Sequence, residues 1–172
     1  MPEIGISKIE AAKGQLETAI DLFFKDRDIV SIHTLAAAAH EILHQISSPQ
    51  GVKGIIKDLD LVKPEYKRVY MDKVKEAENF FKHSGKDQKK IYLFNPETTE
   101  IFIYDACSMY RQLTKENPKM MLIFSAWFAI KLPEMFIEQK VKEGLNAAAK
   151  YTDINNRPLF FKEFSDLYDR MY

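Results

Sequence analysis

The chain has 172 residues, of which 46% are hydrophobic and 12% aromatic, enough apolar material for one packed core. Its 25 lysines and arginines balance 25 aspartates and glutamates, so no net charge draws the protein to nucleic acid or to an anionic membrane. The single cysteine, Cys107, excludes an internal disulfide and fits a reducing compartment. We expect residues 1–172 to form a single domain.

Helix signals follow one another along the chain. Ser7 and Glu10 match a capping box that opens a helix ending near Lys25. Asp28 can cap a second helix that ends near Ser47. Proline, asparagine and glycine mark the later boundaries. They predict a helical turn over 53–59 and helices over 64–84, 96–115, 118–131, 133–150 and 158–172.

The predicted elements define an all-α fold, a single-domain helical bundle of about six to seven helices. Only residues 91–94 have strand character, and a strand without a partner is marginal. The most apolar run, residues 120–130, is shorter than the roughly 20 residues needed to cross a bilayer. The N-terminus has no apolar segment of signal-peptide type. We therefore expect a cytoplasmic protein with no membrane partner.

Residues 40–44 read His-Glu-Ile-Leu-His, the helical pattern with which zinc proteases bind their metal and activate water. No third ligand follows at a recognisable spacing, and no sheet edge is predicted to align a substrate. Glu41 and His44 also match half of a di-iron site, but no second Glu-x-x-His occurs in the chain. We predict no metal and no cofactor, and His40, Glu41 and His44 are the candidate ligands for the alternative.

His33, His40 and His44 share one stripe of the second predicted helix, because spacings of seven and eleven residues return to within roughly 20° of the same direction. The centre of the apolar face lies about a third of a turn away. The stripe is therefore expected to flank the buried face, at a groove between helices. We predict that His33 and His44 contribute to binding there.

The densest polar cluster lies at the end of the third predicted helix. Asn79 and His83 are four residues apart and project together from its last turn, with Lys82 and Asp87 close by in the sequence. We expect Lys82 and Asp87 to take part in binding. The functional prediction is spatial, because it requires His33, His44, Asn79 and His83 to converge in one pocket that solvent can reach.

Two stretches resemble a known family when taken together. Residues 28–39 contain His-Thr-Leu-Ala and are followed by Glu41-Ile42-Leu43-His44, and residues 79–83 read Asn-Phe-Phe-Lys-His with Asp87 beyond. They resemble a family of small uncharacterised bacterial helical proteins with HTLA, E-I-x-H and NFFKHA-x-x-D signatures. Asn95-Pro96 and Trp127-Phe128 match its later features. The resemblance spans most of the chain and implies no established activity.

A more distant resemblance is to HEPN domains, helical bundles of toxin–antitoxin and phage-defence systems, many of which cleave RNA with an Arg-Asn-x-x-x-His motif. Asn79 and His83 match this motif, whereas Glu78 stands where the arginine belongs. The resemblance implies that His83 acts as the acid or base and that Asn79 orients the substrate. The glutamate argues against cleavage, because the arginine stabilises negative charge on the scissile phosphate.

Three functions therefore stay open. We predict a non-catalytic binding or regulatory bundle, with self-association into a homo-oligomer considered. The first alternative is an HEPN-like protein that acts on RNA through Asn79 and His83. The second alternative is a metal-binding protein that uses His40, Glu41 and His44. The sequence identifies no ligand and leaves open whether the protein is an enzyme.

Overall fold

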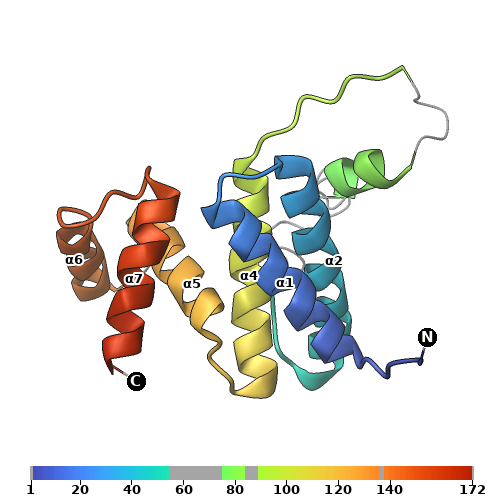
Figure 1. Cartoon of the computed structure of the whole chain (residues 1–172), viewed down its shortest axis with the longest axis horizontal. Helices are drawn as coiled ribbons and strands as arrows, with labels where there is room; N and C mark the ends of the chain where they lie inside the picture. The colour runs from blue at the N-terminus through green and yellow to red at the C-terminus, as the bar shows by residue number, and fades with distance from the viewer. Residues whose placement is uncertain (1, 55–74, 84–88, 136–137, 172) are drawn as a thin grey trace.

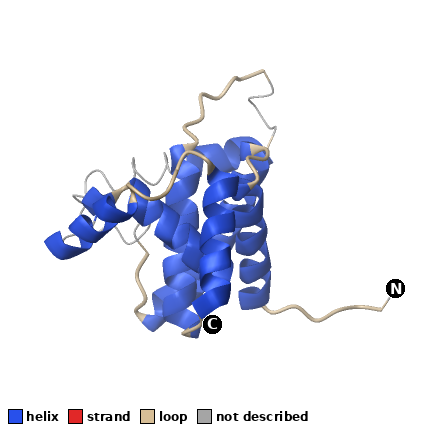
Figure 2. Cartoon of the chain, turned by 60° about the vertical axis from the view of Figure 1, so that its left-hand side comes forward, coloured by secondary structure: helices blue, strands red, loops and turns tan. Residues whose placement is uncertain are grey.

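The computed structural model describes residues 2–54, 75–83, 89–135 and 138–171, and within these ranges it is all-α, as predicted (Figures 1 and 2). Residues 91–94 form neither helix nor strand. The elements are α1 (Lys8–Phe24), α2 (Ile29–Ser47), η1 (Ser48–Gln50), α4 (Glu97–Thr114), α5 (Lys119–Lys131), η2 (Pro133–Met135), α6 (Gln139–Ala148) and α7 (Arg157–Met171), with a further helical segment over 75–82.

Side-chain caps fix the first two helices where the sequence places them. At the start of α1, the Ser7 hydroxyl accepts from the Glu10 amide at 3.2 Å, and a Glu10 carboxylate oxygen accepts from the Ser7 amide at 2.8 Å. Asp28 caps α2 by accepting from the Ser31 amide at 2.8 Å. In the turn between these helices Asp26 has a φ of 49°, a conformation that aspartate tolerates better than most residues. The capping box and the Asp28 cap are confirmed.

The core lies between α1, α2 and α4, which stand side by side in Figure 1. α2 faces both of its neighbours with small side chains, because Ala36, Ala37 and Ala39 are all buried. Small residues let helix axes approach closely, so the longer side chains of α1 and α4 fill the space between them. α2 is therefore covered over a wide arc of its surface.

Aromatic side chains attach α5 and α7 to this core. Phe23 on α1 meets Trp127 and Phe124 on α5 edge-on, with ring centroids 4.8 and 5.1 Å apart. Phe160 on α7 is fully buried and stacks parallel to Phe24, with centroids 6.2 Å apart. The Trp127 indole donates to the Ile154 carbonyl at 2.9 Å, which ties down the segment that leads into α7.

One predicted helix is wrong, and parts of two others lie outside the described residues. The single helix expected over 133–150 is instead a 3₁₀ turn, η2, and a separate α6, since the backbone of Glu138 before α6 is extended. Of the helix predicted over 64–84, the structure describes and confirms only 75–82, and of the predicted turn over 53–59 only 53–54, which are not helical. Within the described ranges, no helix is both long and apolar enough to span a bilayer.

Candidate functional site

The histidine stripe of α2 is buried rather than exposed in a groove. His33 and His40 are both 0% exposed, and their rings face α4. The prediction that the stripe flanks the buried face was wrong, because α2 packs against α1 on one side and α4 on the other. His44, one turn beyond His40, is half-buried. The stripe forms a polar seam between α2 and α4.

His33 lies in an aromatic environment with one hydrogen-bond partner. Its Nδ1 is 3.1 Å from the hydroxyl of buried Thr99, while its Nε2 has no partner among the described residues. The rings of Phe94, Phe102 and Phe81 surround the imidazole, with centroids 4.9, 5.2 and 5.8 Å away. Burial lowers the pKa of His33 from 6.5 to about 4. The Glu78 carboxylate opposes this shift in pKa and the Lys82 ammonium adds to it.

His40 forms the second polar contact of the seam. Its Nε2 is 2.8 Å from an Asp105 carboxylate oxygen, and both side chains are buried. The backbone of Gly54 packs on the same carboxylate, since a Cβ built on Gly54 would lie 3.0 Å from it. The Nδ1 of His40 is also buried and has no hydrogen-bond partner among the described residues, so only Nε2 bonds to α4. A buried contact between two helices helps to fix how they pack. We interpret the His40–Asp105 pair as structural.

The arrangement around residues 40–44 does not assemble three metal ligands from the described part of the chain. The rings of His40 and His44 are nearly parallel, with centroids 6.4 Å apart. Glu41 instead accepts a hydrogen bond from Gln45 at 2.8 Å, and no group of three His, Cys, Asp or Glu side chains within the described ranges is placed to hold an ion. The metal-binding alternative stays a prediction.

Asn79, on the last turn of the helical segment 75–82, and His83, directly after that segment, are exposed, whereas His33 is fully buried beside the same segment. A pocket that solvent can reach and that includes His33 together with these two side chains is therefore not formed. Lys82 forms an ion pair with Glu78 one turn earlier. Asp87 lies outside the described residues. The proposed roles of Asn79, Lys82 and His83 stay predictions.

Sequence reasoning missed a charged cleft where the ends of five helices meet. Arg157, the first residue of α7, lies 4.0 Å from the centroid of the Phe23 ring, and its nitrogens are 3.3 Å from Asp26 and 3.7 Å from Glu100. On the other side of Glu100, the Lys131 ammonium donates to the carboxylate at 2.6 Å. Glu100 is only 4% exposed, and burial raises its pKa although both cations oppose that rise.

Two hollows open beside Arg157, and we call them together the Arg157 cleft. One has a volume of about 280 Å³ and the other about 350 Å³, and both have Asp26 and Arg157 in their walls. The smaller hollow is also lined by Phe23, Arg27, Ile29, Ile32, Pro96 and Glu100, and the larger by Trp127, Lys131, Ile154 and Asn155. Aromatic walls with a few fixed charges are characteristic of small-ligand sites.

One sequence signal could have pointed to the cleft. Glu100 is in line with Ile103, Cys107 and Tyr110, at spacings of three, seven and ten residues, on the apolar stripe of its helix. A carboxylate on such a stripe is predicted to be buried and to require a cationic partner. Arg157 carries no comparable signal, since its position depends on how α7 packs.

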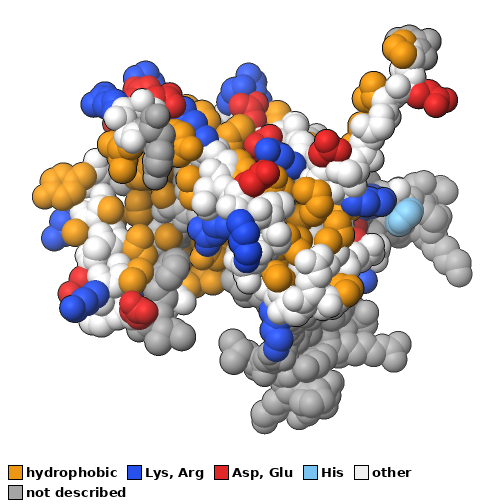
Figure 3. All heavy atoms as spheres, turned by 90° about the horizontal axis from the view of Figure 1, so that it is seen from below, with side chains coloured by type: hydrophobic (Ala, Val, Ile, Leu, Met, Phe, Trp, Pro, Cys, Tyr) orange, Lys and Arg blue, Asp and Glu red, His pale blue; other side chains and the backbone are white. Residues whose placement is uncertain are grey.

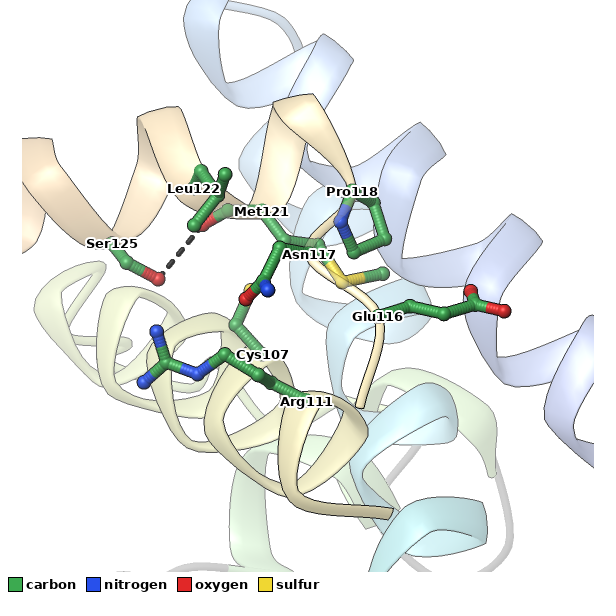
Figure 4. A pocket seen from close by; sticks show the side chains of 8 residues that line it. All are labelled: Cys107, Arg111, Glu116, Asn117, Pro118, Met121, Leu122 and Ser125. Carbon is green, nitrogen blue, oxygen red and sulfur yellow. Dashed lines mark hydrogen bonds between the residues drawn. The ribbon is translucent and has the colours of Figure 1, made fainter. Parts of the chain in front are cut away.

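A smaller hollow beside Cys107 is not a ligand site. Figure 4 shows Arg111 and Asn117 gathered with Cys107 between α4 and α5, and the Ser125 hydroxyl donating to the Met121 carbonyl at 2.7 Å. The enclosed volume is about 10 Å³, enough for roughly one water molecule. Burial raises the pKa of the Cys107 thiol, so the thiol is unreactive at neutral pH.

Comparison of the chain with protein-family models, curated proteins and solved structures found no match. The resemblances drawn from the sequence motifs therefore stay predictions. The Arg157 cleft has to be interpreted from its own geometry.

Proposed function

We propose that the protein is a non-catalytic binding module whose ligand, a small polar molecule, occupies the Arg157 cleft. The observation that carries this proposal is the pair of hollows of about 280 and 350 Å³ that share Asp26 and Arg157 in their walls. Each is large enough for a small metabolite and too small for a folded partner. Binding there would contact α1, α2, α4, α5 and α7 together.

The chemistry of the walls supports binding rather than catalysis. Among the described residues that line the cleft there is no serine, cysteine, histidine or tyrosine, and the carboxylates Asp26 and Glu100 are both held in ion pairs. The buried carboxylate of Glu100 lies between Lys131 and Arg157. This arrangement supports a structural role for Glu100, which holds the two cations in place.

The rigidity of the site also supports binding. The guanidinium of Arg157 is held against the Phe23 ring, and the Lys131 ammonium lies 5.3 Å from the centroid of the Trp127 ring. Cations held by aromatic rings and carboxylates are already ordered before a ligand arrives, so less side-chain entropy is lost on binding.

Trp127 provides a direct test, since it is the only tryptophan in the chain and lines the larger hollow. Its indole N–H gives a single resonance in a ¹H–¹⁵N NMR spectrum of the labelled protein. We expect at least one compound from a panel of neutral, anionic and cationic metabolites to shift this resonance with saturation.

The matched variants for this experiment are Asn155→Phe and Asn146→Phe. Both residues are exposed, but only Asn155 lines the cleft, while Asn146 lies on α6. The shift should be lost in Asn155→Phe and kept in Asn146→Phe. A panel that leaves the indole resonance unmoved, or a shift unaffected by Asn155→Phe, would contradict the proposal.

We propose in addition that the protein self-associates through the surface between α5 and α7. Figure 3 shows hydrophobic side chains reaching the surface on the side of the molecule where these helices lie. An apolar groove there is lined by Leu122, Phe164 and Leu167, and Leu167 is 50% exposed. Light scattering should give more than one chain per particle for the wild type and fewer for Leu167→Glu. A monomeric wild type would refute self-association.

A further inference from the structure

The side chain of Arg27 lines the smaller hollow and forms no ion pair with any described residue. It lies in the turn between α1 and α2, directly after Asp26, and it is exposed. Arg157 lines the same hollow from α7. Two arginines from distant parts of the chain therefore line one cavity of about 280 Å³.

Arg157 keeps donors available although it has two acidic neighbours. Its distances of 3.3 Å to Asp26 and 3.7 Å to Glu100 exceed the roughly 2.7–2.9 Å of a strong charge-assisted hydrogen bond. A guanidinium carries five N–H donors, so these loose contacts leave part of its edge unused. One face of the group lies against Phe23, and its N–H donors point outward along the edge, where an acceptor can bind.

The smaller hollow has two basic and two acidic side chains in its walls, and one of the basic ones has no ion pair with any described residue. Its walls carry Arg27, Arg157, Asp26 and Glu100. Glu100 pairs with Lys131 at 2.6 Å, and Lys131 also lies 3.6 Å from Glu97. Asp26 pairs with Arg157, so Arg27 is the wall charge that has no ion pair among the described residues. An anionic group would supply the missing charge.

From this geometry we propose that the ligand of the Arg157 cleft is a small organic anion, whose carboxylate or phosphate group is bound between Arg27 and Arg157. This inference rests on the proposed function, since it names the chemical class of ligand for the same cleft. Carboxylate and phosphate share the paired oxygen acceptors that match the planar donor edge of arginine. The larger hollow, with Trp127 and Asn155 in its wall, would hold the rest of the molecule.

The test is a titration of the Trp127 indole resonance with succinate, inorganic phosphate and, as a cation, putrescine. We expect succinate, phosphate or both to bind, and putrescine not to bind. Binding of only one anion would support the inference and would identify which of the two acidic groups the site prefers. Binding of putrescine alone would overturn the anionic class while leaving the proposed cleft intact. Binding of none of the three would also overturn the anionic class, and the cleft itself fails only if the wider metabolite panel leaves the resonance unmoved as well.

Two single variants should change anion affinity in opposite directions. Arg27→Gln should weaken anion binding about tenfold or more, since a charged hydrogen-bonding partner is lost. Asp26→Asn should tighten it severalfold, because a competing carboxylate is removed from Arg157, and asparagine tolerates the positive φ of this position. A general loss of structure cannot produce this gain in affinity.

Lys25→Gln is the matched control, because it removes one exposed positive charge from the same turn. Lys25 forms an ion pair with Asp21 at 2.8 Å and does not line either hollow. Its anion affinity should equal that of the wild type. Equal weakening in Arg27→Gln and Lys25→Gln, or weaker anion binding in Asp26→Asn, would overturn the inference.

Discussion

His33 makes the protein's stability depend on pH. Its pKa is about 4 in the folded protein and 6.5 when exposed, so the unfolded chain binds more protons between these two values. The contribution to stability is therefore fully present above about pH 6.5, is lost as the pH falls, and stops changing below about pH 4. The total is about 3 kcal/mol for this shift in pKa.

Urea unfolding at about pH 7 and about pH 4.5 measures this effect. Acidification should destabilise the wild type more than His33→Gln, which has no imidazole to protonate. His83→Gln, which removes an exposed histidine, should behave like the wild type. An unchanged pH dependence in His33→Gln would show that the folded protein already accepts a proton at this position.

The contributions of His40 and Asp105 to stability should be strongly coupled, because both side chains are buried and they contact each other. His40→Phe removes one hydrogen-bonding partner of the buried Asp105 carboxylate, so it is expected to cost about 1.5–3 kcal/mol of unfolding free energy. In a double-mutant cycle, His40→Phe combined with Asp105→Asn should cost clearly less than the sum of the two single variants. If urea unfolding shows that the cost of the double variant equals the sum of the two single costs, the His40–Asp105 contact itself contributes nothing to stability.

The residues of the seam show what helical periodicity can and cannot predict. The spacing of His33, His40 and His44 correctly indicates that they share one side of α2. Whether that side meets solvent or another helix depends on α4, which follows more than forty residues later in the chain. Thr99 and Asp105, which contact the histidines, could not be paired with them from the sequence, because no local spacing connects the two helices.

At the scale of elements, α7 carries Arg157 into the cleft, and its anchor is Phe160. This ring is fully buried, stacking on Phe24 and on Phe164. Phe160→Ala should lower the free energy of unfolding by about 3–5 kcal/mol, the usual cost of removing a buried phenylalanine. It should also change the fluorescence of Trp127, whose indole donates to the segment that leads into α7.

Phe161→Ala is the control for this prediction, since the neighbouring ring is half-buried. It should cost less in chemical unfolding and leave the fluorescence of Trp127 closer to that of the wild type. Equal effects of the two variants would mean that α7 is not anchored through Phe160.

Helix starts were easier to predict than the helix over 133–150. The caps at Ser7 and Asp28 act within three residues, so local sequence is sufficient to place them. Pro133 likewise marks a helical start, but only the turn η2 forms there. α6 buries none of its residues in the core, so little packing favours one continuous helix over two separate elements.

At the scale of the whole molecule, the RNA-directed alternative makes a prediction that the binding proposal does not. If Asn79 and His83 act on RNA, His83→Ala should abolish RNA cleavage and relieve any growth inhibition caused by expression of the protein. Both residues are exposed, so the substitution should leave the fold intact, which circular dichroism can check. Equal behaviour of wild type and His83→Ala would exclude this alternative.

The all-α fold was predictable because periodicity, caps and prolines act within single helices. The Arg157 cleft was not predictable from the sequence. Its charged residues come from four separate stretches of the chain, and only the packing of α7 against α1 and α5 brings them together: Asp26, Glu100, Lys131 and Arg157. Glu100 on an apolar stripe was its one local sign.

A crystal structure of the protein with the compound that most strongly shifts the Trp127 resonance tests the central claim most directly. We predict that the compound lies in the Arg157 cleft, with its acidic group between Arg27 and Arg157, and contacts residues of both α1 and α7. Electron density for it in the groove between α5 and α7, or beside Asn79 and His83, would contradict the account.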